Sequence, residues 1–217
     1  MSSFVLKLIA TTSMLIDHSG YLIFNGFSYM NYIGRLAFPI FAFLITEGYI
    51  HTSNLKKYFS RLLIFALISQ IPYMLLFPNH FTFNILFTLA FGLLSITVYD
   101  KCENKSLGFT LVILCAVLAQ LLNFDYGWFG IATIFIFYVF KREKLYMNIL
   151  FYITTFIHYT YYFAKTLKIE YLLIFICCTL ALIPINLYNG KKGKNIKYFL
   201  YIFYPLHLIA LYLIKLI

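Results

Sequence analysis

The sequence predicts an all-α protein: a polytopic bundle of transmembrane helices that forms a single domain over residues 1–217. The composition is 63% hydrophobic and only 11% charged, whereas a soluble domain is about half apolar and about a quarter charged. Apolar runs recur along the whole chain, and none of the connections between them is long enough to act as a linker between two domains. These observations predict a membrane protein built from one unit.

The apolar runs give the expected number of spans. A membrane-spanning helix needs about 20 residues, with roughly 17 to 25 allowed, and on this rule the chain holds nine candidates. The sixth is short, so eight spans with a re-entrant sixth segment is the alternative. The predicted segments are approximately Phe4–Phe24, Ile33–Ile50, Tyr58–Phe77, Phe81–Tyr99, Leu107–Leu122, Phe129–Phe140, Leu145–Phe163, Tyr171–Tyr188 and Tyr198–Leu216.

Basic residues alternate from loop to loop, which predicts the orientation of the chain. Loops with many Lys and Arg residues stay in the cytoplasm, so we expect a cytoplasmic N-terminus and an external C-terminus. The net charge of +10 is therefore interpreted as membrane orientation and not as nucleic-acid binding. The bases of the predicted cytoplasmic loops are Lys56, Lys57, Arg61, Lys101, Lys105, Lys141, Arg142, Lys144, Lys191, Lys192, Lys194 and Lys197; the opposite loops hold Lys165 and Lys168.

The first predicted segment carries three ionisable residues, Lys7, Asp17 and His18, in an otherwise apolar run. Such groups are costly in hydrocarbon and usually functional. At 100° per residue, Lys7, Thr11, Met14 and His18 fall within roughly 60° of one another on a helix. This stripe must face protein or water. We therefore hypothesise that His18 handles protons inside a membrane enzyme.

The second predicted segment holds Arg35 near its external end, Pro39, and Glu47 near its cytoplasmic end. Pro39 removes a backbone hydrogen bond and predicts a kink, which either lines a cavity or is an ordinary transmembrane proline. Arg35 either serves a site or extends to the lipid headgroups. Glu47, four residues before His51, either shapes a cytoplasmic entrance or marks a hydrated helix end.

Other candidates lie farther along the chain. Asn84, at the external surface, either binds an acceptor or caps a turn. His207 is a second histidine, near the middle of the last segment; a lone buried histidine is usually structural, but two in one bundle favour function. The basic loop at residues 189–194 either sets topology or attracts the phosphates of a nucleotide cofactor. The four cysteines show no metal-ligand spacing and predict no disulfide framework.

Four motifs stand out: Leu15-Ile-Asp17-His18-Ser-Gly20, Gly34-Arg35-Leu-Ala-Phe-Pro39-Ile-Phe-Ala-Phe-Leu-Ile-Thr-Glu47-Gly48 with His51-Thr52, Gln70-Ile-Pro72-Tyr73, and Tyr204-Pro205-Leu-His207-Leu. These motifs resemble the TraX family, membrane proteins of conjugative plasmids linked to N-terminal acetylation of F-type pilin. The resemblance runs from about Leu6 to the last predicted helix. The family is similar, more distantly, to multi-span acyltransferases that O-acetylate bacterial surface polysaccharides. Those enzymes have a first-helix histidine with a basic residue eleven positions earlier, the spacing of Lys7 and His18, although arginine is usual there and Lys offers no bidentate fork.

The resemblance implies an acyltransferase of the bacterial cytoplasmic membrane. Acetyl-CoA would supply the acyl group from the cytoplasm, and a peptide N-terminus, glycan or lipid would accept it. The expected catalytic residues are His18, Asp17 and His207; the expected substrate-binding residues are Arg35, Glu47, Lys7 and Asn84; no metal is expected.

The roles of the individual residues stay open at this level. His18 is expected to act as a general base or as a transient acyl carrier. Asp17 projects about 100° away from His18 on a helix, so we expect it to pair with Arg35 or Lys7, or to orient His207. Two functions from other classes are alternatives: a proton-coupled small-molecule transporter, because intramembrane ionisable residues also build proton relays, and a structural assembly factor.

Overall fold

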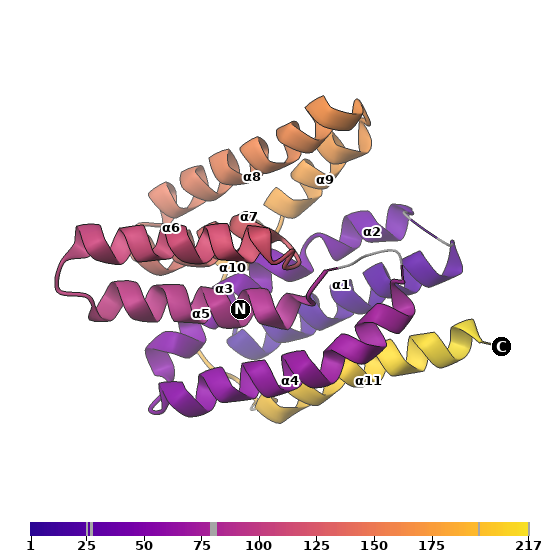
Figure 1. The fold of residues 1–217 in the computed structure, drawn as a ribbon, viewed down its shortest axis with the longest axis horizontal. Helices are drawn as coiled ribbons and strands as arrows, with labels where there is room; N and C mark the ends of the chain where they lie inside the picture. The colour runs from indigo at the N-terminus through magenta and orange to yellow at the C-terminus, as the bar shows by residue number, and fades with distance from the viewer. Residues whose placement is uncertain (25, 27, 79–81, 195, 217) are drawn as a thin grey trace.

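The computed structural model describes residues 1–24, 26, 28–78, 82–194 and 196–216, and the described residues form a bundle of α-helices (Figure 1). Within these residues the only β-type pairing is an isolated bridge between Phe83 and Phe124. The all-helical prediction is confirmed. In chain order the helices are α1 (Ser3–Ile23), α2 (Tyr29–Gly34), α3 (Ala37–His51), α4 (Leu55–Leu76), α5 (Ile85–Lys101), α6 (Lys105–Leu121), α7 (Gly127–Val139), α8 (Lys144–Thr166), α9 (Glu170–Thr179), α10 (Leu182–Asn186) and α11 (Lys197–Lys215).

Two of the expected segments are helices that proline residues interrupt. Arg35 and Leu36 separate α2 from α3, and their amides bond three residues back, to Tyr32 and Ile33. Pro39 lacks the N–H that would bond the Arg35 carbonyl, so the α-helical ladder stops there. Pro184 likewise lacks the N–H that would bond the Leu180 carbonyl, and α9 ends just before Leu180, at Thr179.

When α2–α3 and α9–α10 are each counted as one segment, the described residues form nine helical segments. These segments follow the predicted ranges to within a few residues. The predicted start of the fourth segment at Phe81 lies outside the described residues. Within the described residues, three helices are long and apolar enough to cross a membrane: Tyr29–His51, Leu55–Leu76 and Tyr198–Lys215. The nine-span count, the orientation and the single-domain assignment stay predictions.

The short sixth segment, α7, runs from one end of the bundle to the other. Tyr126, which precedes it, lies beside Arg35, and Tyr138 near its last turn donates to Asp100 at the end of α5. Its 13 residues extend about 20 Å at 1.5 Å per residue. The choice between nine spans and eight spans with a re-entrant sixth segment stays a prediction.

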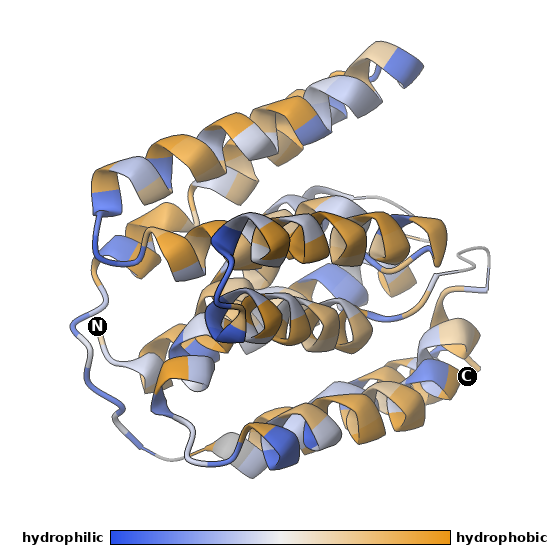
Figure 2. Cartoon of the chain, turned by 60° about the vertical axis from the view of Figure 1, so that its left-hand side comes forward, coloured by the Kyte–Doolittle hydropathy of each residue, from blue (hydrophilic) through white to orange (hydrophobic). Residues whose placement is uncertain are grey.

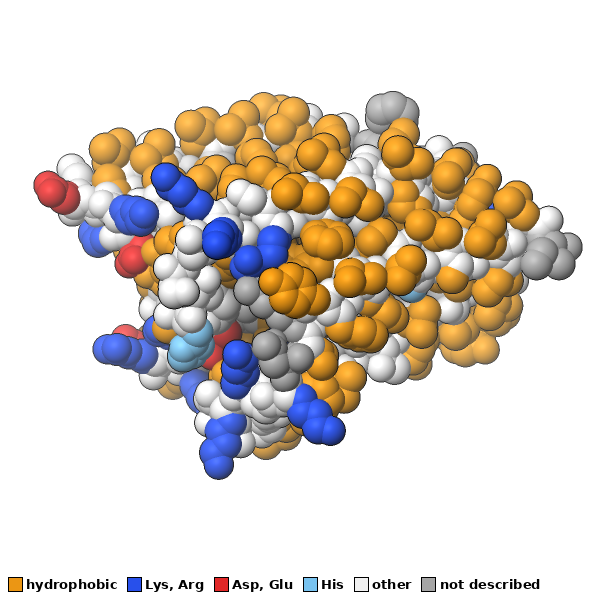
Figure 3. Space-filling view, turned by 90° about the horizontal axis from the view of Figure 1, so that it is seen from below, with side chains coloured by type: hydrophobic (Ala, Val, Ile, Leu, Met, Phe, Trp, Pro, Cys, Tyr) orange, Lys and Arg blue, Asp and Glu red, His pale blue; other side chains and the backbone are white. Residues whose placement is uncertain are grey.

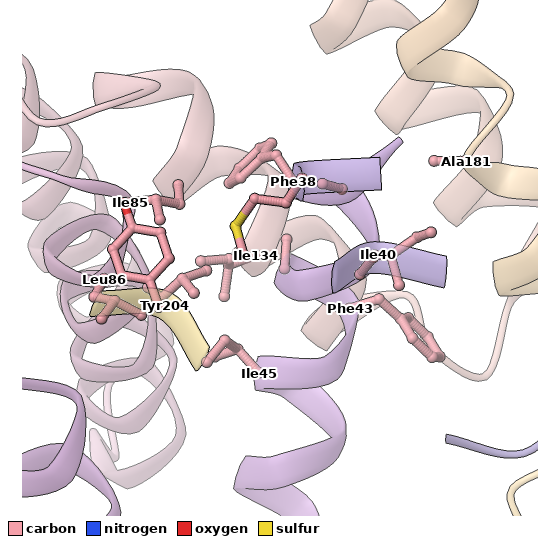
Figure 4. Packing of buried hydrophobic residues seen from close by; sticks show 14 of the residues in the cluster. Phe38, Ile40, Phe43, Ile45, Ile85, Leu86, Ile134, Ala181 and Tyr204 are labelled. Atoms are coloured by element: carbon pink, nitrogen blue, oxygen red, sulfur yellow. The ribbon is translucent and has the colours of Figure 1, made fainter. Parts of the chain in front are cut away.

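The core lies between α3, α5 and α7 and is closed by large apolar side chains. Phe38, Ile40 and Phe43 of α3 are 6% exposed or less, and Ile134 of α7 is fully buried (Figure 4). Small residues bring α5 and α7 close together, because a Cβ at Gly92 would lie 2.1 Å from Cδ1 of Ile134. Close packing through glycine is typical of membrane helices.

The remaining helices pack around this centre. Figure 1 shows α4 beside α11 along one edge and the α8–α9 hairpin along the opposite edge, with α1 and α3 between them. Figure 2 shows helices that are largely hydrophobic, with hydrophilic residues near their ends and in the connections. In Figure 3 most of the Lys and Arg side chains gather at one end of the molecule, and apolar side chains cover much of the rest of the visible face.

Candidate active site

A pair of histidines from opposite ends of the chain lies between α1 and α11. Nδ1 of His18 and Nε2 of His207 are 2.8 Å apart, a hydrogen bond that joins residues 189 positions apart. Nδ1 of His207 lies 2.8 Å from the backbone carbonyl oxygen of Phe203, one turn earlier on α11. The structure thus brings together two of the predicted catalytic residues.

These two hydrogen bonds fix where the protons sit on a neutral pair. A carbonyl oxygen only accepts, so Nδ1 of His207 carries its proton and donates to Phe203. Nε2 of His207 is then an acceptor, and Nδ1 of His18 must donate to it. The remaining nitrogen, Nε2 of His18, keeps its lone pair. The pair therefore presents one defined basic atom.

Aromatic side chains surround the pair. His207 is only 6% exposed, and its ring stacks on Phe203 with centroids 4.8 Å apart. Phe77, at the end of α4, meets His18 edge to face at 5.3 Å and contacts Tyr21 at 4.7 Å. Apolar walls exclude water and strengthen the hydrogen bonds within the site.

Asp17, the neighbour of His18 in sequence, belongs to a separate cluster. Nη2 of Arg35 donates to both Asp17 carboxylate oxygens, at 2.8 and 2.9 Å. The side-chain amide of Asn31 donates to one of these oxygens at 2.7 Å, and Nε of Arg35 donates to the Asn31 carbonyl at 3.0 Å. Of the partners expected for Asp17, the structure thus selects Arg35. The carboxylate holds the interrupted α2–α3 segment against α1.

Two further residues complete this cluster, and sequence reasoning did not find them. Gly34 lets α2 approach α1, since a Cβ there would lie 2.3 Å from the Asp17 Cβ. Tyr126 stacks on Phe38 with centroids 4.0 Å apart and holds its hydroxyl 3.5 Å from Nη1 of Arg35. No local pattern in the sequence links Tyr126 to Arg35.

The cluster lies beside one more acid, in the loop between α6 and α7. Asp125 is half-buried, and the loss of water around its carboxylate raises its pKa to about 6. The neighbouring Arg35 guanidinium opposes this rise, and the Asp17 carboxylate adds to it.

A cavity of about 540 Å³ leads from the basic end of the bundle toward the histidine pair. On α1 its lining residues are Ser3, Lys7, Thr11 and Met14, so the predicted stripe faces this space except at His18. Met14 is one turn before His18. On α11 the innermost lining residue is Tyr204, three residues before His207. The cavity therefore stops one turn short of the pair on both helices.

The outer part of the cavity combines basic groups with Glu47. Lys7, Arg61 and Lys192 line it from α1, α4 and the connection between α10 and α11. Glu47 also lines it; its carboxylate accepts a hydrogen bond of 2.8 Å from the hydroxyl of Tyr188 and lies 3.6 Å from Nε2 of His51. Arg61 was assigned only to topology from the sequence, because its position near a helix start gave no sign of a cavity.

The connection before α11 is fastened to the start of the chain. Backbone amides of Ser3 and Phe4 donate to the carbonyls of Lys191 and Lys192 at 2.8 and 3.1 Å, and the Asn189 amide donates to Met1 at 2.9 Å. The first amides of α1, which a helix leaves unsatisfied, are therefore occupied by protein. Gly190 and Lys192 of the basic loop at residues 189–194 line the cavity, and both interpretations of this loop stay predictions.

Asn84 takes a different place from the one expected of a substrate-binding residue. It is fully buried and caps α5 by accepting from the amide of Leu86 at 3.1 Å. Its side-chain amide donates to the Ala66 carbonyl and to Oε1 of Gln70, both at 2.8 Å. These bonds tie α5 to α4, and the Asn84 amide points into the protein interior. The structure therefore supports the alternative that Asn84 caps a turn, and not that it binds the acyl acceptor.

Metal ligation finds no support in the described residues, which contain no group of three or more His, Cys, Asp or Glu side chains placed to hold an ion.

An all-helical chain with membrane-length apolar helices and buried ionisable pairs defines a membrane protein with an internal polar site. It belongs to the TraX family: residues 2–215 match the family described as TraX protein. The chain is 28% identical to the probable fimbrial assembly protein FimC, serogroup H1, of Dichelobacter nodosus, over 97% of this chain and 94% of that protein. It is 27% identical to the uncharacterized protein RP591 of Rickettsia prowazekii (strain Madrid E), over 89% of this chain and 83% of that protein. No solved structure matches the chain.

Proposed function

We propose that this protein is an acyltransferase of the bacterial cytoplasmic membrane. It moves an acyl group from cytoplasmic acyl-CoA, with acetyl-CoA as the expected donor, to an amine or hydroxyl of an envelope or secreted acceptor. One observation carries the proposal: the His18–His207 pair lies one turn beyond the inner end of a cavity with a basic mouth.

His18 is the general base of the proposed reaction. Its Nε2 takes the proton of the acceptor as the acceptor nitrogen or oxygen attacks the thioester carbonyl carbon. The new acceptor–carbon bond forms, the carbon–sulfur bond breaks, and the CoA thiolate leaves with the proton that His18 returns. A neutral imidazole suits both steps, because its ordinary pKa lies near working pH.

His207 is a positioning residue in this scheme. Its Nε2 accepts a hydrogen bond from the Nδ1–H of His18. This bond selects the His18 tautomer whose Nε2 carries no proton. The same hydrogen bond stabilises the imidazolium that forms when His18 takes a proton, as the third group of a catalytic triad does. Asp17 and Arg35 hold the α2–α3 segment next to His18 and leave the proton transfer to the histidines.

Met14 and Tyr204 stand between the cavity and the histidine pair. The rings of Tyr204 and His207 are 5.5 Å apart, and Met14 is only 8% exposed. A methionine side chain has three rotatable bonds and adapts readily to its surroundings, so a rotation of Met14 opens the route for the thioester. The proposed reaction therefore needs no movement of a helix.

The acceptor is proposed from the relatives. One relative is named a probable fimbrial assembly protein, and an envelope or secreted protein would present an N-terminal amine to such an enzyme. A glycan or lipid hydroxyl is the other acceptor class that the same base serves.

A proton-coupled transporter is the second candidate, and one observation favours it. Interrupted helices are a feature of transporter binding sites, and α2–α3 and α9–α10 are two such helices. A transporter would move its substrate without breaking a thioester.

The test uses the full chain purified in detergent, acetyl-CoA and an envelope extract. Free CoA thiol is measured with a chromogenic disulfide, and envelope peptides, glycans and lipids are weighed by mass spectrometry. We expect thiol release together with the mass increase of one acyl group on one acceptor. Uptake of a solute into proteoliposomes without thiol release would favour the transporter.

The decisive variant is His18→Asn, because the asparagine amide still donates to His207 but has no basic nitrogen. We expect the rate of acyl transfer to fall by about 10²–10⁴-fold, the usual contribution of a general base, with an unchanged melting temperature. A folded His18→Asn protein that transfers acetyl at the wild-type rate would refute His18 as the base.

A further inference from the structure

Three basic side chains from separate parts of the chain border one cavity. Arg61 comes from the second turn of α4, Lys7 from α1, and Lys192 from the connection before α11. Figure 3 shows Lys and Arg side chains gathered at one end of the molecule. Because these three bases approach from three directions, they form a concave positive surface and not a row along one helix.

Arg61 is distinguished from the other bases by an unsatisfied donor. Its Nε atom is buried, yet within the part of the chain that the structure describes it has no hydrogen-bond partner. Leaving a buried donor of a charged group without a hydrogen bond costs free energy. Such donors nearly always have a protein or solvent partner. The orphan N–H belongs to a side chain that lines the cavity and that also interacts with Tyr201, another lining residue. An unsatisfied donor in a cavity wall is a group that a ligand can complete.

The acid in the cavity does not balance these charges. Glu47 is the single carboxylate among the described lining residues, and it accepts from Tyr188 and lies near His51. Three cations therefore share the space with one carboxylate. The first backbone amides of α1 are also occupied, so side chains and not a helix terminus would bind an anion here.

We propose that Arg61, Lys7 and Lys192 form a phosphate-binding site at the cavity mouth, and that its ligand is the phosphorylated nucleotide end of a soluble thioester donor. Naming the donor rests on the proposed function; the phosphate site itself does not. The guanidinium of Arg61 offers a planar fork to two phosphate oxygens, while Lys7 and Lys192 act as point charges. Arg61 thus supplies the bidentate contact that Lys7 cannot provide.

The site places a nucleotide at the mouth and the rest of the donor along the cavity. Besides these bases the cavity has apolar lining residues, among them Leu62, Leu86 and Leu89, and it is also lined by Tyr204. In Figure 4, Leu86 and Ile85 lie close to Tyr204. A ligand with phosphates at one end and a slender chain ending in a thioester fits this combination of charged and apolar lining.

Binding measurements on the full chain in detergent test the site. The probes are CoA, its fragment adenosine 3′,5′-bisphosphate, and pantetheine, which lacks phosphate. For Arg61→Met we expect at least tenfold weaker binding of CoA and of the bisphosphate, with unchanged binding of pantetheine. Arg61→Lys should lose an intermediate amount, because an ammonium keeps the charge without the fork. Melting temperatures establish that each variant is folded.

Lys56→Met is the matched control. It removes the same charge from the first turn of the same helix, on an exposed residue outside the cavity lining. We expect its affinities to stay within twofold of the wild type. An equal loss of CoA affinity in Lys56→Met and Arg61→Met would show only general electrostatic attraction. That result would overturn the proposed phosphate site.

The outcomes separate this inference from the proposed reaction. Unchanged CoA binding by folded Arg61→Met, alongside normal acetyl transfer, would overturn the phosphate site and leave the acyltransferase standing. Arg61-dependent binding of the bisphosphate with no thiol release from acyl-CoA would support the site and refute acyl transfer. Binding of short-chain phosphatidylglycerol in place of CoA and the bisphosphate would identify a lipid headgroup and overturn the nucleotide assignment.

Discussion

Two consecutive residues of α1, Asp17 and His18, enter two different pairs. Arg35 donates to both oxygens of the Asp17 carboxylate, and Asn31 donates to one of them. The His18 ring makes one hydrogen bond, to His207, and its Nε2 keeps a lone pair. The first pair is charged and satisfied, so it suits the docking of one segment on another. The second is neutral and leaves a basic atom, so it suits proton transfer.

The comparison teaches that two adjacent ionisable residues of one helix can take different roles, because each has a different partner. The ionised Asp17–Arg35 pair stabilises the fold, and the neutral His18–His207 pair is the candidate for chemistry. Variants of the Asp17–Arg35 pair should lower stability, and variants of the His18–His207 pair should lower activity. A variant of either pair that lowers both properties would contradict this division.

Removing the carboxylate should give the largest loss of stability. Asp17→Ala leaves the Arg35 guanidinium, 21% exposed, without its counter-charge, and we expect the free energy of unfolding to fall by about 2–3 kcal/mol, less than for a fully buried pair. The double variant Asp17→Ala/Arg35→Met should recover more than half of this loss, because no charge remains unpaired. Thermal unfolding in detergent measures both.

The division between the pairs would break if Asp17→Ala kept its wild-type stability and lost acyl transfer. Asp17 would then be a catalytic residue and not a docking residue.

Replacing His207 should mainly affect the rate. In His207→Phe, Nδ1 of His18 loses its acceptor and the tautomer is no longer selected, so we expect kcat to fall by roughly 10–100-fold, the usual cost of losing a supporting hydrogen bond. KM for acyl-CoA should stay constant. His207→Gln should recover most of the rate, because the glutamine oxygen replaces Nε2 as acceptor. Equal rates for the two variants would contradict the positioning role.

Substituting glycine beside the docking pair should give a smaller effect. In Gly34→Ala the new Cβ would lie 2.3 Å from Cβ of Asp17, which Arg35 and Asn31 hold in place. We expect a loss of about 1–3 kcal/mol in the free energy of unfolding, as for other overpacked sites.

Gly48→Ala is the control for this substitution. There the new Cβ would lie 2.5 Å from the hydroxyl oxygen of Tyr58, the far end of a side chain that can turn into the cavity. Its unfolding free energy should fall by less than about 1 kcal/mol. A loss as large as that of Gly34→Ala would show that the Asp17 cluster is not specially rigid.

The sequence by itself determined the helical class and the approximate limits of the segments, because apolar length and loop charge act locally along the chain. It also located His18, Arg35 and Glu47 as misplaced ionisable residues, since a polar group in an apolar run is visible without a fold. Pro39 predicted an interruption, and the helix breaks one turn before it, at the carbonyl that proline leaves unbonded.

Only the tertiary structure decided how these residues combine. The contact of His18 with His207 depends on α1 meeting α11 across 189 positions, and no local period encodes such a meeting. The choice of Arg35 for Asp17, the capping role of Asn84 and the place of Arg61 in a cavity wall likewise depend on which helices become neighbours. A hydrogen bond extends about 3 Å, so the chemistry of each group was settled by packing that the linear pattern could not specify.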